Sequence, residues 1–243
     1  MLDAFTALAR GTRLAYGPGL RRYVFVPIAI NLLVYAAMLW YVLAHFGGWL
    51  EGWMAMVPAW LAWLEWLIWP LFVVSLVLVV FFTFTLVTHL IAAPFYGFLA
   101  EKVEVAATGR VPLDDRGLAK TAVDALGREL VKLAYILPRM ALLFAISWIP
   151  VVNLLAPLLW ALFSAWMMAI TYLDYPMDNN KVSFADMRRR LAARWWPTLT
   201  YGGGVTLITW IPLANLFLLP GAVAGGVLLW DRHYRHLRDL SPR

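Results

Sequence analysis

The chain has 243 residues, of which 63% are hydrophobic and only 14% are charged. Soluble domains are about 45–50% apolar, so a soluble monomer of this composition would have to expose large apolar patches. The net charge of +6 does not by itself indicate nucleic-acid binding, because Lys and Arg also gather in the cytoplasmic segments of membrane proteins. The absence of cysteine excludes disulfide bonds, thiolate metal sites and cysteine nucleophiles. We therefore expect an all-α integral membrane protein in a lipid bilayer, with no nucleic-acid partner.

The N-terminal segment, residues 1–22, does not have the pattern of a signal peptide, so the first apolar run is expected to stay in the membrane. Residues 1–16 are predicted to form an amphipathic helix. Its apolar face should hold Leu2, Phe5, Leu8, Ala9 and Thr12. Such a helix either lies on the membrane surface or packs against the cytoplasmic face of the protein itself. Gly17-Pro18-Gly19 should end it.

Two transmembrane spans are predicted in the first half of the chain. Residues 23–46 carry no formal charge and, at about 1.5 Å per residue, are long enough to cross a hydrocarbon core of about 30 Å. Pro27 falls in the first turns of this span, where proline is tolerated. Residues 47–65 form a loop rich in Trp, which favours the membrane–water interface. Residues 66–100 are a second uncharged run and the second predicted span.

The second half alternates between polar and apolar segments. Residues 101–132 are polar, and the spacing of Leu118, Ala122, Leu126 and Leu130 predicts a cytoplasmic helix there. The remaining segments follow in this order: 133–173 apolar, 174–198 basic, 199–230 apolar and 231–243 a basic tail. Gly202-Gly203-Gly204, at the start of the last apolar segment, should allow close helix packing.

The distribution of Lys and Arg predicts the topology. All 20 lie in four clusters, at the N-terminus, at 102–139, at 181–194 and at the C-terminus, and none lies between Arg22 and Lys102. By the positive-inside rule all four clusters are cytoplasmic and the loop at 47–65 is periplasmic. We therefore expect a multi-pass protein with both termini in the cytoplasm.

This topology makes each of the two later apolar segments begin and end on the cytoplasmic side. Two full crossings would need about 40 apolar residues and a turn. Residues 199–230 are too few, and residues 133–173 contain Arg139 and are interrupted by Pro138, Pro150 and Pro157. The sequence therefore predicts two re-entrant helical hairpins that penetrate the membrane halfway.

The two predicted hairpins share the pattern WIPxxNL, at residues 148–154 and 210–216. Proline interrupts the helix, and the asparagine side chain, Asn153 or Asn215, could satisfy the freed backbone groups. Paired interrupted segments of this kind can mark a transport site. The other interpretation is that the two asparagines simply cap structural turns.

No arrangement of residues predicts an enzyme. The four histidines form no metal-ligand set with the acidic residues, and no Gly-rich phosphate-binding motif occurs, so the chain is not itself an ATPase. Asp174, Asp178 and Asp186 make a weak carboxylate cluster around residues 174–179, which a capped loop explains equally well. We expect no catalytic residue, no metal and no cofactor.

One candidate binding site stands at the start of the first span. If the helix begins near Gly19, then Leu20, Arg21 and Arg22 occupy its first turn, where backbone N–H groups lack helical partners and the helix dipole favours an anion. Two guanidinium groups beside those donors would make a compact oxyanion site. Alternatively, Arg21 and Arg22 only anchor the span at the lipid headgroups.

Several motifs together resemble the CysZ sulfate-permease family. They are Gly19-Leu20-Arg21-Arg22, the stretch 92–101 (AAPFYGFLAE), the stretch 163–167 (FSAWM) followed by 174–179 (DYPMDN), and the WIPxxNL turn near the C-terminus. They occur in the same order as in the family and cover nearly the whole chain.

The resemblance implies a bacterial inner-membrane protein that admits sulfate for cysteine biosynthesis, with two long transmembrane helices and two pairs of half-penetrating helices. It also implies dimers that assemble into larger oligomers. The family's sulfate-binding motif falls on Gly19, Leu20, Arg21 and Arg22, which favours the oxyanion interpretation of that site. Transport should be passive or coupled to an ion gradient, with a channel favoured. The rival functions are a membrane scaffold or accessory subunit for another transporter, and an intramembrane enzyme, for which the sequence offers no nucleophile.

Overall fold

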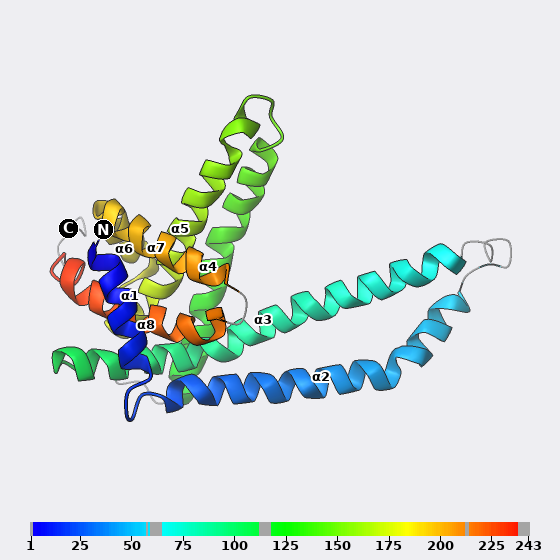
Figure 1. Ribbon diagram of the computed structural model, residues 1–243, viewed down its shortest axis with the longest axis horizontal. Coiled ribbons are helices and arrows are strands. Elements are labelled where there is room, and N and C mark those ends of the chain that lie inside the picture. Colours follow the sequence, from blue (N-terminus) through cyan, green and yellow to red (C-terminus); the bar gives the residue numbers. More distant parts are fainter. Residues whose placement is uncertain (1, 57, 59–64, 112–117, 212–213, 238–243) are drawn as a thin grey trace. The chain divides into compact units, whose positions relative to one another are not determined.

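The computed structural model describes residues 2–56, 58, 65–111, 118–211 and 214–237, which form helices joined by turns (Figure 1). The helices are α1 Leu2–Ala15, α2 Arg22–Met54, α3 Glu65–Thr108, α4 Leu118–Ile146, α5 Val152–Asn179, α6 Phe184–Ala193, α7 Trp195–Thr209 and α8 Ala214–His233. No residue in these ranges is in a strand, which confirms the all-α prediction. The chain divides into two compact units, one of residues 25–92 and one of residues 1–24 with 93–243.

Two helices in the described part of the chain are long and apolar enough to cross a membrane, α2 and α5. The first contains the predicted span at 23–46, with Pro27 inside the helix. The second predicted span, 66–100, lies within α3, which runs unbroken from Glu65 to Thr108. These features are consistent with a helical membrane protein. Helix α5 is longer than expected, because the sequence predicted short helices interrupted by proline in this segment.

The unit of residues 25–92 consists of most of α2 and the first part of α3. Both helices expose large apolar side chains on several faces, among them Leu32, Leu33, Trp40, Leu43, Phe81 and Phe82. A helix that is hydrophobic all round is ordinarily covered by protein or by lipid. Phe72 lies between Phe46 and Trp53, with ring centres 6.2 Å apart in each pair.

Part of the segment 47–65, which was predicted to be a periplasmic loop, is helical. Helix α2 continues to Met54, so the first part of that segment is helical. Residues 57 and 59–64, where most of the remaining loop was placed, lie outside the described residues. The apolar run 23–46 and residues 47–54 therefore form one helix, because Trp, Leu and Met are all compatible with a continuing helix.

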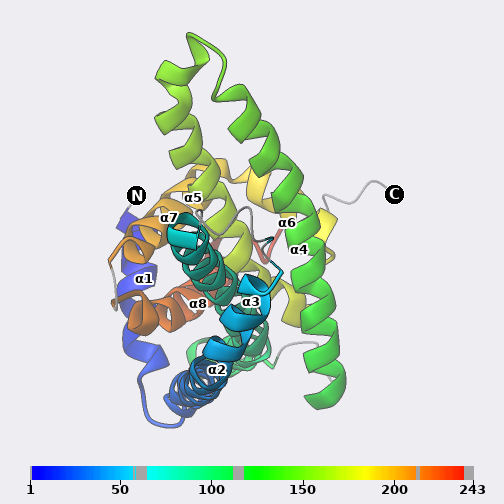
Figure 2. The ribbon, with the colours of Figure 1, turned by 90° about the vertical axis from the view of Figure 1, so that its right-hand side faces the viewer.

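Helix α1 packs against α8, and the two lie side by side in both ribbon views (Figures 1 and 2). The buried residues of α1 are Ala4, Ala7, Leu8, Gly11 and Ala15. The predicted apolar face was wrong in part: Leu8 is buried as predicted, whereas Phe5 and Ala9 are exposed. Small size decides the contact: a Cβ atom on Gly11 would lie 2.2 Å from the backbone nitrogen of Gly225. Of the two placements considered for this helix, the structure has the one packed on the protein itself.

Close approach through glycine also joins α7 to α5. A Cβ atom on Gly202 would lie 1.8 Å from the carbonyl oxygen of Ala165, so the two backbones touch. This confirms the packing role predicted for Gly202-Gly203-Gly204. Tyr201 beside it is fully buried, and its hydroxyl donates to the carbonyl of Ala222 in α8. Helices α1, α5, α7 and α8 therefore form the core of this unit.

Helices α4 and α5 form a hairpin whose two arms run side by side in opposite directions (Figures 1 and 2). Pro150 lies in the turn between them, as predicted, whereas Pro138 and Pro157 lie inside α4 and α5 and interrupt neither helix. The tip is apolar and open, with Trp148 75% and Leu154 83% exposed. Pro150 therefore coincides with the end of a helix, and the other two prolines do not.

The predicted capping role of Asn153 was wrong. Its side chain is exposed, and no side chain caps the start of α5 at Val151. The turn is held instead by Ser147, whose hydroxyl donates to the carbonyl of Leu143 at 2.7 Å and accepts from Trp160 Nε1 at 3.2 Å. In the second WIPxxNL copy, Pro212 and Leu213 and the side chain of Asn215 lie outside the described residues.

Candidate functional site

The motif Gly19-Leu20-Arg21-Arg22 lies in the turn between α1 and α2. Gly19 has a φ of 83°, a left-handed backbone conformation that favours glycine. The N–H groups of Leu20 and Arg21 both donate to the carbonyl of Gly17, at 3.1 and 3.3 Å. The expectation that Leu20 and Arg21 belong to the first turn of the helix was wrong, since α2 begins at Arg22. Two of the N–H groups expected to face an anion are therefore already used within the turn.

The side chains of the motif divide into an anchor and a pair of cations. Leu20 is 9% exposed and Val24 is fully buried, so they fix the turn against the rest of its unit. Arg21 and Arg22 are exposed, and among the described residues neither pairs with a carboxylate. The guanidinium of Arg22 donates to the Tyr23 hydroxyl at 3.1 Å and lies 4.9 Å from the centre of its ring. The turn thus exposes two guanidinium groups, neither of which has a carboxylate partner in the described part of the chain.

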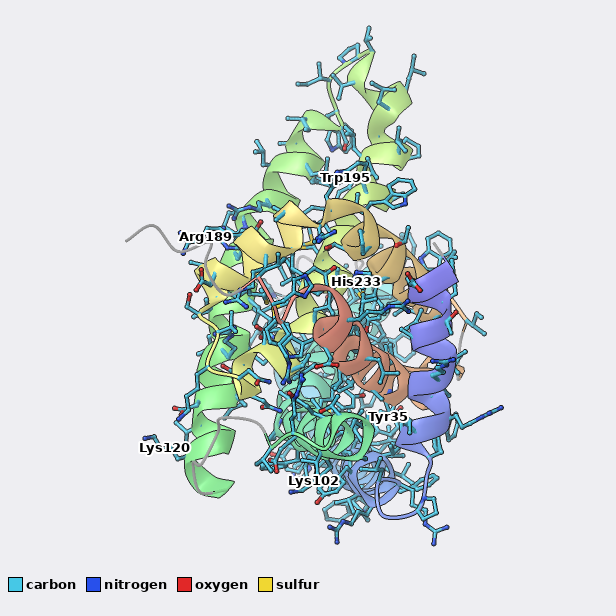
Figure 3. All side chains as sticks on the ribbon, turned by 90° about the vertical axis from the view of Figure 1, so that its left-hand side faces the viewer. Tyr35, Lys102, Lys120, Arg189, Trp195 and His233 are labelled. Atoms are coloured by element: carbon cyan, nitrogen blue, oxygen red, sulfur yellow. The ribbon has the colours of Figure 1, made fainter. Side chains whose placement is uncertain are left out.

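Helix α3 brings a third cation close to this turn. A hydrogen bond to Glu101 raises the pKa of Lys102, and the nearby Arg22 opposes that rise electrostatically. The Lys102 ammonium donates to Glu101 at 2.7 Å (Figure 3 labels Lys102). Sequence reasoning missed Lys102 because only the tertiary fold brings it near Arg22. It follows directly after the stretch 92–101, however, which was among the motifs that carried the family resemblance.

A network of buried charges joins the end of α5 to α4. The carboxylate of Asp174, 2% exposed, accepts from Arg128 at 2.7 and 3.0 Å and lies 3.3 Å from the Lys132 ammonium. Lys132, also 2% exposed, pairs with Glu129, and Arg128 lies 3.5 Å from Asp178. Every charge in this set has an opposite charge beside it, as buried charges require. Residues 174–179 are the last turns of α5, so the capped-loop explanation of this segment was wrong.

The third member of the predicted carboxylate cluster stands apart. Asp186 lies in the first turn of α6, where its backbone N–H donates to the side chain of Ser183 at 3.1 Å. Its carboxylate pairs with Arg189 at 2.9 Å, at the surface. The structure therefore joins Asp174 and Asp178 in one network and leaves Asp186 outside it.

A second buried group of charges connects α3 with α5 and the end of α8. Glu104 is fully buried, pairs with Arg235, and accepts from Asn180 at 2.9 Å. Asn179 donates to the carbonyl of Gly97 at 2.8 Å. The structure thus brings together the stretches 92–101 and 174–179, two of the motifs that carried the resemblance. No clear sequence signal marked Glu104 or Lys132 as buried, because each lies close to other charged residues: Glu104 follows Glu101 and Lys102, and Lys132 follows Arg128 and Glu129.

A cavity of about 20 Å³ lies where these motifs meet. Its lining includes Ala93, Pro94 and Gly97 of α3, Arg128 and Lys132 of α4, and Asp174 of α5. This volume is enough for about one water molecule and too small for a tetrahedral oxyanion.

As a class, the chain is a helical membrane protein with an exposed arginine pair placed before its first span. The sequence model of the family described as "Sulfate transporter CysZ/Etoposide-induced protein 2.4" matches residues 7–220. A protein of Pseudomonas fluorescens named "Sulfate transporter CysZ" is 49% identical over 93% of this chain and 92% of its own length. Proteins of the same name from Pseudomonas paraeruginosa and Pectobacterium atrosepticum are 44% and 41% identical, over 93% and 96% of this chain.

The chain therefore belongs to the CysZ/EI24 family. This confirms the resemblance seen in the sequence motifs. The family's description names a transporter rather than an enzyme, in agreement with the absence of a predicted catalytic set.

Proposed function

We propose that this protein transports sulfate across the bacterial inner membrane and supplies it for cysteine biosynthesis. The observation that carries the proposal is the match to relatives named as sulfate transporters, at 41–49% identity over nearly the whole chain. An exposed, uncompensated arginine pair supports it from the structure, because a doubly charged oxyanion needs charged donors. The alternative, an accessory subunit for another transporter, predicts that the purified protein alone gives no sulfate flux in liposomes.

The proposed sulfate site consists of Gly19, Leu20, Arg21 and Arg22 at the cytoplasmic mouth of the first span. Gly19 permits the left-handed turn, and Leu20 anchors it, so that Arg21 and Arg22 stand next to each other in solvent. The N–H groups of Gly19 and Arg22 make no backbone hydrogen bond among the described residues, so they remain available to an anion. Lys102 adds a third positive charge near Arg22.

For the architecture, we propose two full spans within α2 and α3 and two re-entrant hairpins, α4–α5 and α7–α8. The positive-inside distribution supports it, and so do the exposed apolar tips at Trp148 and Trp210, which suit contact with lipid or with another copy. The segments keep their proposed roles: 47–65 is periplasmic, whereas 101–132, 174–198 and 231–243 are cytoplasmic. We further propose dimers that assemble into larger oligomers.

For the mechanism, we propose a channel whose closed state is held by the Asp174 ion pairs. Sulfate would pass only when the ion pairs of Arg128 and Lys132 with Asp174 separate, which frees two cations for the passing anion. The sequence has no phosphate-binding motif for nucleotide-driven transport, so movement should be passive or coupled to an ion gradient, and we favour the channel.

The topology can be tested by single-cysteine labelling, since the chain has no native cysteine. Gly52→Cys should react with an impermeant thiol reagent in whole cells, because Gly52 is exposed in the segment assigned to the periplasm. Ala192→Cys, exposed on α6 in the basic segment, should react only after the cells are permeabilised. Labelling of Ala192→Cys from outside intact cells would overturn the proposed topology.

A further inference from the structure

A cationic groove lies between α1 and α8, away from the Arg21–Arg22 turn. Its volume is about 440 Å³. Its charged lining residues are Asp3, Arg10, Arg13 and Arg232, and its apolar ones include Leu14, Leu228 and Leu229. The proposed sulfate site uses none of these residues.

The charge in this groove is only partly balanced. Arg232 donates to the Asp3 carboxylate at 2.7 Å, and that carboxylate also lies 3.9 Å from His233 Nε2. Arg10 and Arg13, one helical turn apart on α1, have no carboxylate partner among the described residues. Like charges three positions apart on a helix repel each other. An anion that lies between the two guanidinium groups would therefore stabilise them.

The groove also crosses the boundary between apolar and charged sequence. On α8, Leu228 and Leu229 are followed within one turn by Arg232, where the apolar segment 199–230 ends. On α1, Leu14 lies next to Arg13 and one turn from Arg10. A phospholipid has a matching arrangement, with an anionic phosphate next to apolar chains. A free oxyanion would gain nothing from the leucine side chains, which offer no hydrogen bond.

We propose that this groove binds the headgroup of an anionic phospholipid. The phosphate lies against Arg10 and Arg13, and the first part of the acyl chains follows Leu14 and Leu228. Basic pockets on the cytoplasmic side of membrane helices recognise lipid phosphates in this way. The bound lipid would clamp α1 onto α8 and so support the turn that carries Arg21 and Arg22.

The test is the thermal unfolding of purified protein in detergent with phosphatidylglycerol added. Phosphatidylglycerol should raise the unfolding temperature of the wild type, and part of this rise should depend on Arg10 and Arg13. That part should not appear with phosphatidylcholine, inorganic phosphate or sulfate. With each arginine near a lipid surface contributing about 1 kcal/mol, R10Q/R13Q should raise the half-effective lipid concentration about 30-fold. R10K/R13K, which keeps the charge, should retain most of the effect.

The matched control is R189Q/R194Q, which removes the same charge from exposed positions of the basic segment. It should keep the wild-type lipid response, as should R21A/R22A, whose defect should be confined to sulfate. The proposal is wrong if R10Q/R13Q responds to phosphatidylglycerol like the wild type, or if the control loses as much. Stabilisation by sulfate or phosphate that requires Arg10 and Arg13 would assign the groove to a free oxyanion instead.

Discussion

Replacing both Arg21 and Arg22 with alanine is expected to abolish detectable sulfate binding while the protein still folds and inserts. Both side chains are exposed and make no ion pair among the described residues, so their loss removes no buried contact. Hydrogen bonds to charged groups contribute roughly 1.5–3 kcal/mol each, so either single alanine variant should weaken binding about 10- to 100-fold. Isothermal titration calorimetry with sulfate on the purified proteins measures the effect.

Two further variants separate anion recognition from simple membrane anchoring. R21K/R22K keeps the charge but loses the planar, fork-shaped donors, so it should bind sulfate more weakly than the wild type and more strongly than the alanine pair. Lys102→Ala should weaken binding to a smaller extent, because Lys102 already shares its charge with Glu101. If the arginines only anchor the span at headgroups, lysine should substitute fully. Wild-type sulfate affinity in R21A/R22A would exclude this turn as the binding site.

The second large effect is expected at Asp174. Asp174→Ala leaves Arg128 and Lys132 without their shared carboxylate in a buried position, and breaking such a pair costs about 3–5 kcal/mol of unfolding free energy. The matched control is Asp186→Ala, which removes a carboxylate from a surface pair with Arg189 and should cost at most about 1 kcal/mol, apart from its effect on α6. Thermal unfolding of the purified proteins in the same detergent compares them.

A double variant tests whether the loss of stability in Asp174→Ala comes from the unpaired buried charges. Asp174→Ala combined with Lys132→Met removes both members of one buried pair and should recover part of the lost stability, because Arg128 still has Asp178 at 3.5 Å. The recovery should be incomplete, because Glu129 loses its lysine partner. Equal stability of Asp174→Ala and Asp186→Ala would show that the network does not hold α4 and α5 together.

The sequence predicts the ends of helices well where glycine or proline lies in the turn between two of them. Gly17-Pro18-Gly19 ends α1, and Pro150 lies in the turn of the α4–α5 hairpin. Prolines inside an apolar stretch were less informative, because Pro138 and Pro157 are accommodated within continuous helices. The face of α1 was predicted wrongly, since hydrophobicity favoured Phe5 whereas the contact with α8 requires small residues such as Gly11.

The site could be predicted only in part for a related reason. Gly19, Leu20, Arg21 and Arg22 are consecutive in the sequence, so they stood out as a candidate anion site, with headgroup anchoring as the alternative until the family resemblance favoured the anion. The buried network depends on residues far apart in the chain, such as Arg128 with Asp174 and Glu104 with Arg235. No local pattern identifies such partners.

Sulfate flux in liposomes that contain only this purified protein distinguishes a transporter from an accessory subunit. Radiolabelled sulfate should enter the liposomes down its gradient without nucleotide, and this uptake should be lost in R21A/R22A and retained in R189Q/R194Q. The amount of protein incorporated into the liposomes is measured for each variant, so that a loss of flux can be distinguished from a failure to incorporate. Flux that is absent from the wild type, with the protein incorporated and able to bind sulfate, would contradict transport by this chain alone and favour an accessory role.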